Sequence, residues 1–152
     1  MQNVIDEMLD YIKVFIEQPN EAFGGMPVCP FASKVRREQR IDFQVGPFSL
    51  SDESSLLQKI DEFKNNPHFD IIIFIHPDKK GLTFEELDKV NRSLNEILTP
   101  DFVAFEGHPD DPFMANGIYT RRDPYPNIQV IAKSTLDAAE KKMLEIQRIK
   151  LL

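Results

Sequence analysis

The chain has 152 residues, of which 41% are hydrophobic and 28% are charged, so it is long enough for one folded domain spanning 1–152 and is unlike a disordered chain. Its formal net charge of −7 disfavours nucleic-acid binding, which relies on clustered Lys and Arg, and its single cysteine excludes an internal disulfide framework and predicts a reducing, cytoplasmic location. Its acidic start and its longest apolar run, residues 71–75, predict neither a signal peptide nor a membrane span.

The N-terminal segment predicts an amphipathic helix. Apolar residues recur at helical spacing from residue 4 to residue 17 and Pro19 ends the pattern, so residues 1–18 form this helix. A loop rich in Gly and Pro follows. Pro30 then stands at the favoured first position of a short helix over residues 31–38, which puts Cys29 at the N-terminal end of that helix.

The rest of the chain alternates strands with helices. Alternating or β-branched apolar residues predict four strands, at residues 41–45, 71–75, 102–105 and 128–131. Capping residues predict the starts of three helices, at Ser51-Asp52, Thr83 with Glu86, and Ser134 with Asp137. The third and fourth strands are separated by a long loop, residues 108–126.

Strands separated by helices favour parallel, right-handed crossovers. We therefore predict an α/β fold with a mixed four-stranded sheet, three strands parallel and one antiparallel, packed by helices as a single layered domain. Parallel strands end at a common edge, where open α/β sheets keep their ligands. His76 and His108 each follow a strand end, so we expect both imidazoles, the long loop and Cys29 at this edge.

Three residues are candidates for catalysis. Cys29 at a helix N-terminus favours a thiolate that can act as nucleophile or metal ligand, although lone cysteines also serve as buried apolar residues. His108 suits general acid–base chemistry with Asp110 as the group that orients it. The tripeptide His-Pro-Asp, which also occurs at His76, equally suits a turn, since Pro and Asp are common turn residues.

The segment from Tyr119 to Pro126 supplies candidate substrate-binding residues. Arginine offers a planar fork for a carboxylate or phosphate, and the candidates are Tyr119, Arg121, Arg122 and Tyr125. The alternative interpretation is an arginine paired internally with Asp110, Asp111 or Asp123. The sequence contains no Gly-rich phosphate loop, His-Glu-x-x-His helix, paired-cysteine zinc spacing or Gly-x-Ser-x-Gly elbow.

Three motifs together resemble a bacterial family known only as a domain of unknown function. The motifs are Met-Pro-Val-Cys-Pro-Phe-Ala at residues 26–32, His-Pro-Asp at 108–110 with Phe113, and Tyr-Thr-Arg-Arg-Asp-Pro-Tyr-Pro at 119–126. The resemblance begins near Met26 and implies a shared fold, with Cys29, His108, Asp110, Tyr119, Arg122 and Tyr125 at the motif positions. It implies no activity. The chain differs from the family pattern at Asp111-Pro112, Arg121 and Asp123.

Three functions follow as hypotheses. The first is a small cytoplasmic enzyme that acts on a small anionic metabolite through the Cys29 and His108 site. The second is a metal-binding protein or metalloenzyme with a divalent transition metal held by Cys29 and His108, with His76 or Asp110 as a further ligand. The third is a non-catalytic accessory subunit, with the N-terminal helix as an interface to a partner or a second copy. We expect no nucleic-acid or membrane partner.

Overall fold

The computed structural model describes residues 1–29 and 32–150, with side chains described up to Glu145 except that of Met143. Four strands form the central sheet in the order β3–β4–β8–β5. Their bounds are Ile41–Val45 for β3, Ile71–Ile75 for β4, Phe102–Gly107 for β5 and Asn127–Ala132 for β8. All four lie where the sequence predicts strands, and β5 and β8 are longer than predicted.

The pairing of the strands differs in part from the prediction. Only β3 and β4 form a parallel pair, whereas β8 pairs antiparallel with both β4 and β5. The sheet thus has one parallel pair instead of three parallel neighbours, because the last strand of the chain inserts between β4 and β5. Since β4 and β5 are each antiparallel to β8, they still point the same way, and their C-terminal ends meet at the edge where β8 begins.

The described residues form five α-helices. They are α1 (Gln2–Tyr11), α2 (Ala32–Arg37), α3 (Glu53–Lys64), α4 (Phe84–Leu98) and α5 (Lys133–Lys150). A π-helical turn, Ile12–Ile16, continues α1, so the predicted N-terminal helix is confirmed. Short 3-10 turns cover Glu21–Phe23 and Leu50–Asp52, and two small antiparallel pairs are β1 (Pro19–Asn20) with β2 (Met26–Pro27) and β6 (Met114–Ala115) with β7 (Ile118–Tyr119).

The helices begin close to the predicted caps. Thr83 and Glu86 form the predicted capping box of α4, with Glu86 N–H donating to Thr83 Oγ1 at 3.1 Å. α3 begins after Asp52, which is its N-cap residue as predicted. In the 3-10 turn just before it, Asp52 accepts from the backbone N–H of Ser49 at 2.9 Å. The predicted start of α2 at Pro30 lies outside the described residues.

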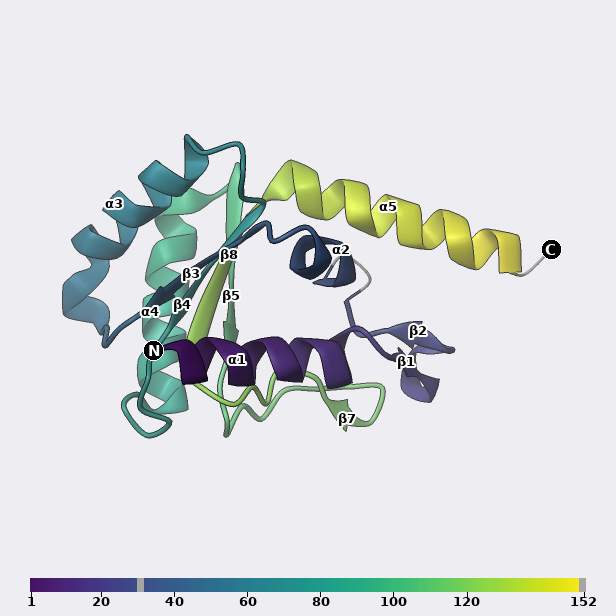
Figure 1. Ribbon diagram of the computed structural model, residues 1–152, viewed down its shortest axis with the longest axis horizontal. Helices are drawn as coiled ribbons and strands as arrows, with labels where there is room; N and C mark the ends of the chain where they lie inside the picture. Colours follow the sequence, from purple (N-terminus) through teal and green to yellow (C-terminus); the bar gives the residue numbers. More distant parts are fainter. Residues whose placement is uncertain (30–31, 151–152) are drawn as a thin grey trace.

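The two faces of the sheet carry separate cores (Figure 1). Residues of α3 and α4 pack on one face, against Ile72, Phe74, Ala104, Ile128 and Val130. Val4 and Met8 of α1 and Leu136 of α5 pack on the other face, against Ile71, Ile73, Ile75 and Ile131. Because β4 contributes to both cores, all five of its residues are buried, as its continuous apolar sequence predicts.

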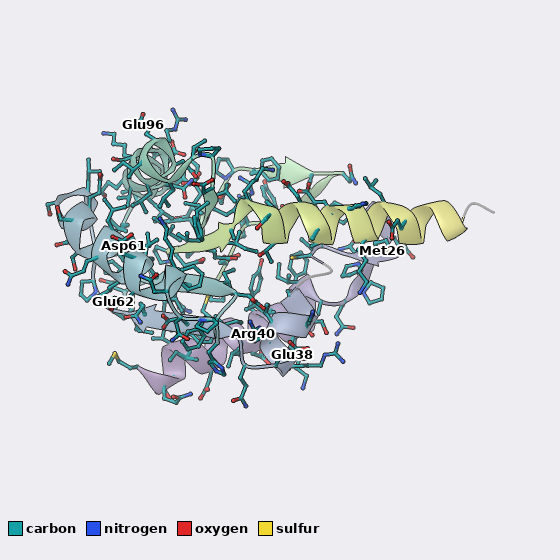
Figure 2. The ribbon with its side chains drawn as sticks, turned by 90° about the horizontal axis from the view of Figure 1, so that it is seen from above. Met26, Glu38, Arg40, Asp61, Glu62 and Glu96 are labelled. Carbon is teal, nitrogen blue, oxygen red and sulfur yellow. The ribbon has the colours of Figure 1, made fainter. Side chains whose placement is uncertain are left out.

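The outer sides of the helices carry charge. Asp61 and Glu62 of α3 and Glu96 of α4 point away from the sheet (Figure 2). The far half of α5 extends beyond the rest of the molecule (Figure 1). Among the described residues, no helix combines the length and apolar character needed to cross a bilayer.

Candidate functional site

The C-terminal ends of β4 and β5 and the start of β8 form one edge of the sheet, and the loop from His108 to Pro126 lies along it. The backbone N–H of His76 donates to the carbonyl of Pro126 at 2.9 Å, and that of His108 donates to the carbonyl of Arg121 at 3.0 Å. Figure 1 shows this loop passing beside α1. The predicted gathering of polar residues at one edge therefore holds for both histidines and the loop.

Both His-Pro-Asp tripeptides form the same turn. In each, Nδ1 of the histidine accepts the backbone N–H of the aspartate two residues later, at 3.1 Å for His76 and 2.9 Å for His108. Nε2 of His108 donates to the carbonyl of Leu82 at 2.7 Å, and only 2% of His108 is exposed. Both nitrogens of the His108 ring are thus held by backbone groups in a buried site. The turn interpretation of this motif accounts for these contacts.

Asp110 does not form the imidazole–carboxylate pair expected of an orienting residue. Its backbone N–H, rather than its carboxylate, is the group bonded to His108, and its side chain is exposed. The exposed carboxylate of Asp110 therefore does not orient the buried imidazole ring of His108. The arrangement at His108 stabilises the turn.

Cys29 connects the N-terminal helix to α2. Its N–H donates to the carbonyl of Ile16 at 3.3 Å, its carbonyl accepts from the N–H of Ala32 at 3.3 Å, and its side chain is half-buried. Within the described part of the chain, no three side chains of His, Cys, Asp or Glu are grouped so that they hold a metal ion. The predicted ligands Cys29, His76 and His108 therefore do not assemble as a metal centre there.

Asp123 is the buried acid at the centre of the edge. Only 5% of it is exposed, and its Oδ2 accepts from Nδ2 of Asn127 at 2.7 Å. A methyl group placed on Gly107 would come within 1.9 Å of the same oxygen, so glycine is required for this approach. Burial raises the pKa of Asp123 from 3.8 to about 6, although hydrogen bonds from Asn127 and Tyr11 and the charge of Arg121 act in the opposite direction.

Tyr11 reaches Asp123 from α1. It is the last residue before the π-helical turn, a type of irregularity that is frequent at functional sites, and its ring stacks on Phe15 with centroids 5.6 Å apart. Burial, and then the negative charge of Asp123, raise the pKa of the Tyr11 hydroxyl above its ordinary value. The hydroxyl therefore stays protonated and donates to the carboxylate.

Asp111 and Glu106 add two further acids. Asp111 is 1% exposed; its Oδ1 accepts the N–H of Phe113 at 2.8 Å, and its Oδ2 has no hydrogen-bond partner among the described residues. Burial raises the pKa of Glu106 to about 8, helped by a hydrogen bond with Asp88 and by the charges of Asp88 and Asp111, while Arg121 lowers it. Asp111 also raises the pKa of Asp123, so one charge acts on both neighbours.

Two arginines complete the edge. The guanidinium carbon of Arg121 lies 4.0 Å from the ring centroid of Phe113, and that of Arg122 lies 3.5 Å from the ring centroid of Tyr119. Nε of Arg122 donates to the backbone carbonyl of Asp111 at 3.1 Å. Within the described part of the chain, the other guanidinium N–H groups of these two residues have no hydrogen-bond partner. They are the donors that an oxyanion needs.

Tyr125, a predicted substrate-binding residue, is instead part of the core. It is 9% exposed and packs in the cluster beneath α1. Its hydroxyl hydrogen-bonds to Glu7, whose pKa it lowers, and Nζ of Lys79 lies 5.0 Å from its ring centroid. Tyr125 thus holds the loop to α1 and to the turn after β4.

The residues that sequence patterns missed are the buried acids and Tyr11. Sequence patterns indicate Asp111 and Asp123 only as internal partners for an arginine and as differences from the family pattern, and they do not single out Glu106. Nothing local marks them, because their burial depends on Gly107, Asn127 and α1. Their position in a Pro-rich loop at a sheet edge is the one signal that the sequence offers.

Comparison with known proteins supports the resemblance seen in the motifs. No curated protein and no solved structure matches the chain. A family model described as protein of unknown function DUF1415 matches residues 19–151, which includes the edge and its loop but not Tyr11. The chain belongs to the DUF1415 family of proteins of unknown function.

Proposed function

We propose that this protein is a small enzyme that binds an anionic metabolite at the sheet edge and exchanges a proton with it through Asp123. One observation supports this most strongly. A buried carboxyl group with a pKa of about 6 lies in the field of Arg121, next to a second arginine whose N–H donors are not fully used. Ionisable groups with shifted pKa values cluster at active sites, where a general acid or base works best near the operating pH.

The two arginines form the anion-binding part of the proposal. Each guanidinium is stacked on an aromatic ring, which fixes its plane and lowers the entropy lost when it binds an oxyanion. Carboxylate and phosphate groups accept two parallel hydrogen bonds from such a plane. Because the chain carries a net charge of −7, this pair is a local positive feature on an acidic protein.

Asp123 takes the acid–base role for which the sequence suggested His108. A proton on Asp123 has to be lost or gained near neutral pH, which its pKa allows. Proton transfer by His108 would instead break a buried hydrogen bond to Leu82 or Asp110. Cys29 remains a proposed nucleophile. The turnover rate of Cys29→Ser, compared with that of Asp123→Asn, tests this role.

Anion binding is tested with the side-chain Nε–H signals of arginine in NMR. Sulfate, as a phosphate mimic, and glutarate, as a dicarboxylate, are titrated into the wild type, Arg121→Gln and Arg122→Gln. The matched control is Arg92→Gln, since Arg92 is exposed and paired with Asp88 on α4. We expect saturable shifts of Arg121 and Arg122 that each site variant weakens about tenfold and the control leaves unchanged. Equal weak shifts of all arginines would contradict the proposed site.

Turnover is tested by mass spectrometry on a metabolite extract incubated with the purified protein. The wild type is expected to deplete or produce an anionic compound, and Asp123→Asn is expected to slow this by about a hundredfold, the usual contribution of a general acid or base. Asp110→Asn, a change at an exposed acid, is the control. An extract left unchanged by the wild type, or changed equally by Asp123→Asn, would remove the enzymatic proposal.

A non-catalytic docking role is the second candidate. The observation in its favour is a group of exposed apolar side chains beside the arginines, with 42% of Phe113, 49% of Met114 and 40% of Tyr119 exposed. The apolar side of α1 packs on the sheet and is not available to a partner. The exposed side chains of Phe113, Met114 and Tyr119 are therefore a better docking surface than this helix. A docking role predicts that Met114→Ser abolishes complex formation and leaves anion binding unchanged.

A further inference from the structure

We propose that the molecule bound at this edge carries a protonated amine as well as its anionic group, and that Asp111 recognises the amine. This inference rests on the proposed function and names the substrate class of the same site. It starts from one side chain. Asp111 is 1% exposed, and its Oδ2 has no hydrogen-bond partner among the described residues.

The carboxylate of Asp111 acts on neighbouring acids and forms no ion pair with a described cation. In the described part of the chain, no Lys, Arg or His nitrogen lies within 4.0 Å of its carboxylate, although six such ion pairs are found elsewhere in that part. Its charge acts instead on Glu106 and Asp123, which are acids themselves. A buried carboxylate without a charge partner is unfavourable, so the closed site lacks a positively charged donor.

A protonated amine fits this requirement better than a metal ion. Metal sites need several ligands, and the described residues hold no suitable group of three. An ammonium group donates up to three hydrogen bonds, and Oδ2 of Asp111 is an acceptor that no described residue uses. The carboxylate of Asp123, which shares the field of Asp111, is a second acceptor within the same cluster.

The anion and the amine would bind to two different groups near one residue. The backbone carbonyl of Asp111 accepts from Nε of Arg122, while the charge of its carboxylate acts on Glu106 and Asp123. A ligand that spans Asp111 therefore meets guanidinium donors at one end and carboxylate acceptors at the other.

Matched pairs of probes test the inference by calorimetry and NMR. Straight-chain ω-amino carboxylates from glycine to 6-aminohexanoate are compared with the carboxylates of the same chain length that lack the amine, from acetate to hexanoate. We expect the amine to tighten binding by about tenfold at one or two chain lengths, because only those lengths span the two subsites. An amine that gives no gain at any length would overturn the inference.

Two variants separate this outcome from the proposed function. Asp111→Asn is expected to abolish the gain from the amine without weakening the binding of the plain carboxylates, whereas Arg122→Gln weakens both series. Asp110→Asn, next in sequence and exposed, is the control. If the plain carboxylates bind and the gain persists in Asp111→Asn, the inference fails and the proposed function stands. If neither series binds, both fail. The wild-type comparison remains decisive even if Asp111→Asn does not fold.

Discussion

The carboxylate of Asp123 rests on the backbone of Gly107, so closely that a Cβ at residue 107 would lie 1.9 Å from Oδ2. This contact joins the loop to the end of β5 at the point where Asn127 begins β8. The position of the acid thus depends on the absence of a side chain on the neighbouring strand.

Gly107→Ala is therefore expected to destabilise the protein by about 1–3 kcal/mol, the range for an overpacked core, because Asp123 is held by hydrogen bonds and has no room to move. The free energy of unfolding in urea measures this. Gly46→Ala is the control, since a Cβ there meets nothing within 4 Å. If the two variants unfold at the same urea concentration, the packing described at Gly107 is incorrect.

The raised pKa of Asp123 predicts how stability depends on pH. The pKa rises from 3.8 to about 6 on folding, so the folded state holds this proton more tightly than the unfolded state. The stabilisation is fully present below about pH 4 and is lost as pH rises through about 6, which amounts to about 3 kcal/mol. Asp123→Asn keeps an oxygen acceptor and removes the charge.

We expect Asp123→Asn to be more stable than the wild type at about pH 8 and to lose this advantage at about pH 4. Urea unfolding at the two pH values measures the difference. Asp110→Asn, at an exposed position, should show no such dependence. If Asp123→Asn were destabilised more at about pH 8 than at about pH 4, each relative to the wild type, the raised pKa assigned to Asp123 would be contradicted.

Tyr11 is expected to affect the pKa of Asp123. Its hydrogen bond lowers the pKa of Asp123, so Tyr11→Phe is expected to raise that pKa above about 6. The carboxyl carbon signal of Asp123, followed by NMR across pH, reports the value. Tyr125→Phe is the matched control, since Tyr125 bonds to Glu7 instead. Equal effects of the two variants would mean that Tyr11 acts through the packing of α1 alone.

His108 should matter for stability. His108→Ala removes two hydrogen bonds and a ring that is 2% exposed, and we expect a loss of about 2–4 kcal/mol. His68→Ala, at an exposed turn, should change stability by less than about 0.5 kcal/mol. Thermal and urea unfolding test this. A fully stable His108→Ala variant without turnover would restore His108 as a catalytic residue.

Local patterns predicted most of the fold. The buried strand at Ile71–Ile75 and the capping box at Thr83 follow from residue types close together in sequence, and such patterns identify elements well. The sequence did not predict that β8 pairs between β4 and β5, because strand order depends on contacts between segments that are distant in sequence. A strand that pairs with two others carries no mark of that choice in its own sequence.

Sequence patterns predicted the sheet edge of the candidate site but not the buried acids that lie there. The strand ends located the edge, whereas the acid at its centre depends on Tyr11, which is distant in sequence, and on Gly107. Asp111, Arg121 and Asp123 share one electrostatic field, which no local sequence pattern indicates.

The most direct test of the account is the pKa of Asp123 measured by NMR with and without saturating sulfate. The account predicts about 6 in the free protein, and a higher pKa with sulfate, because a bound anion offsets the positive field of Arg121. A pKa near the ordinary value of 3.8 that does not move when sulfate is added would contradict both the buried acid and the adjacent anion site.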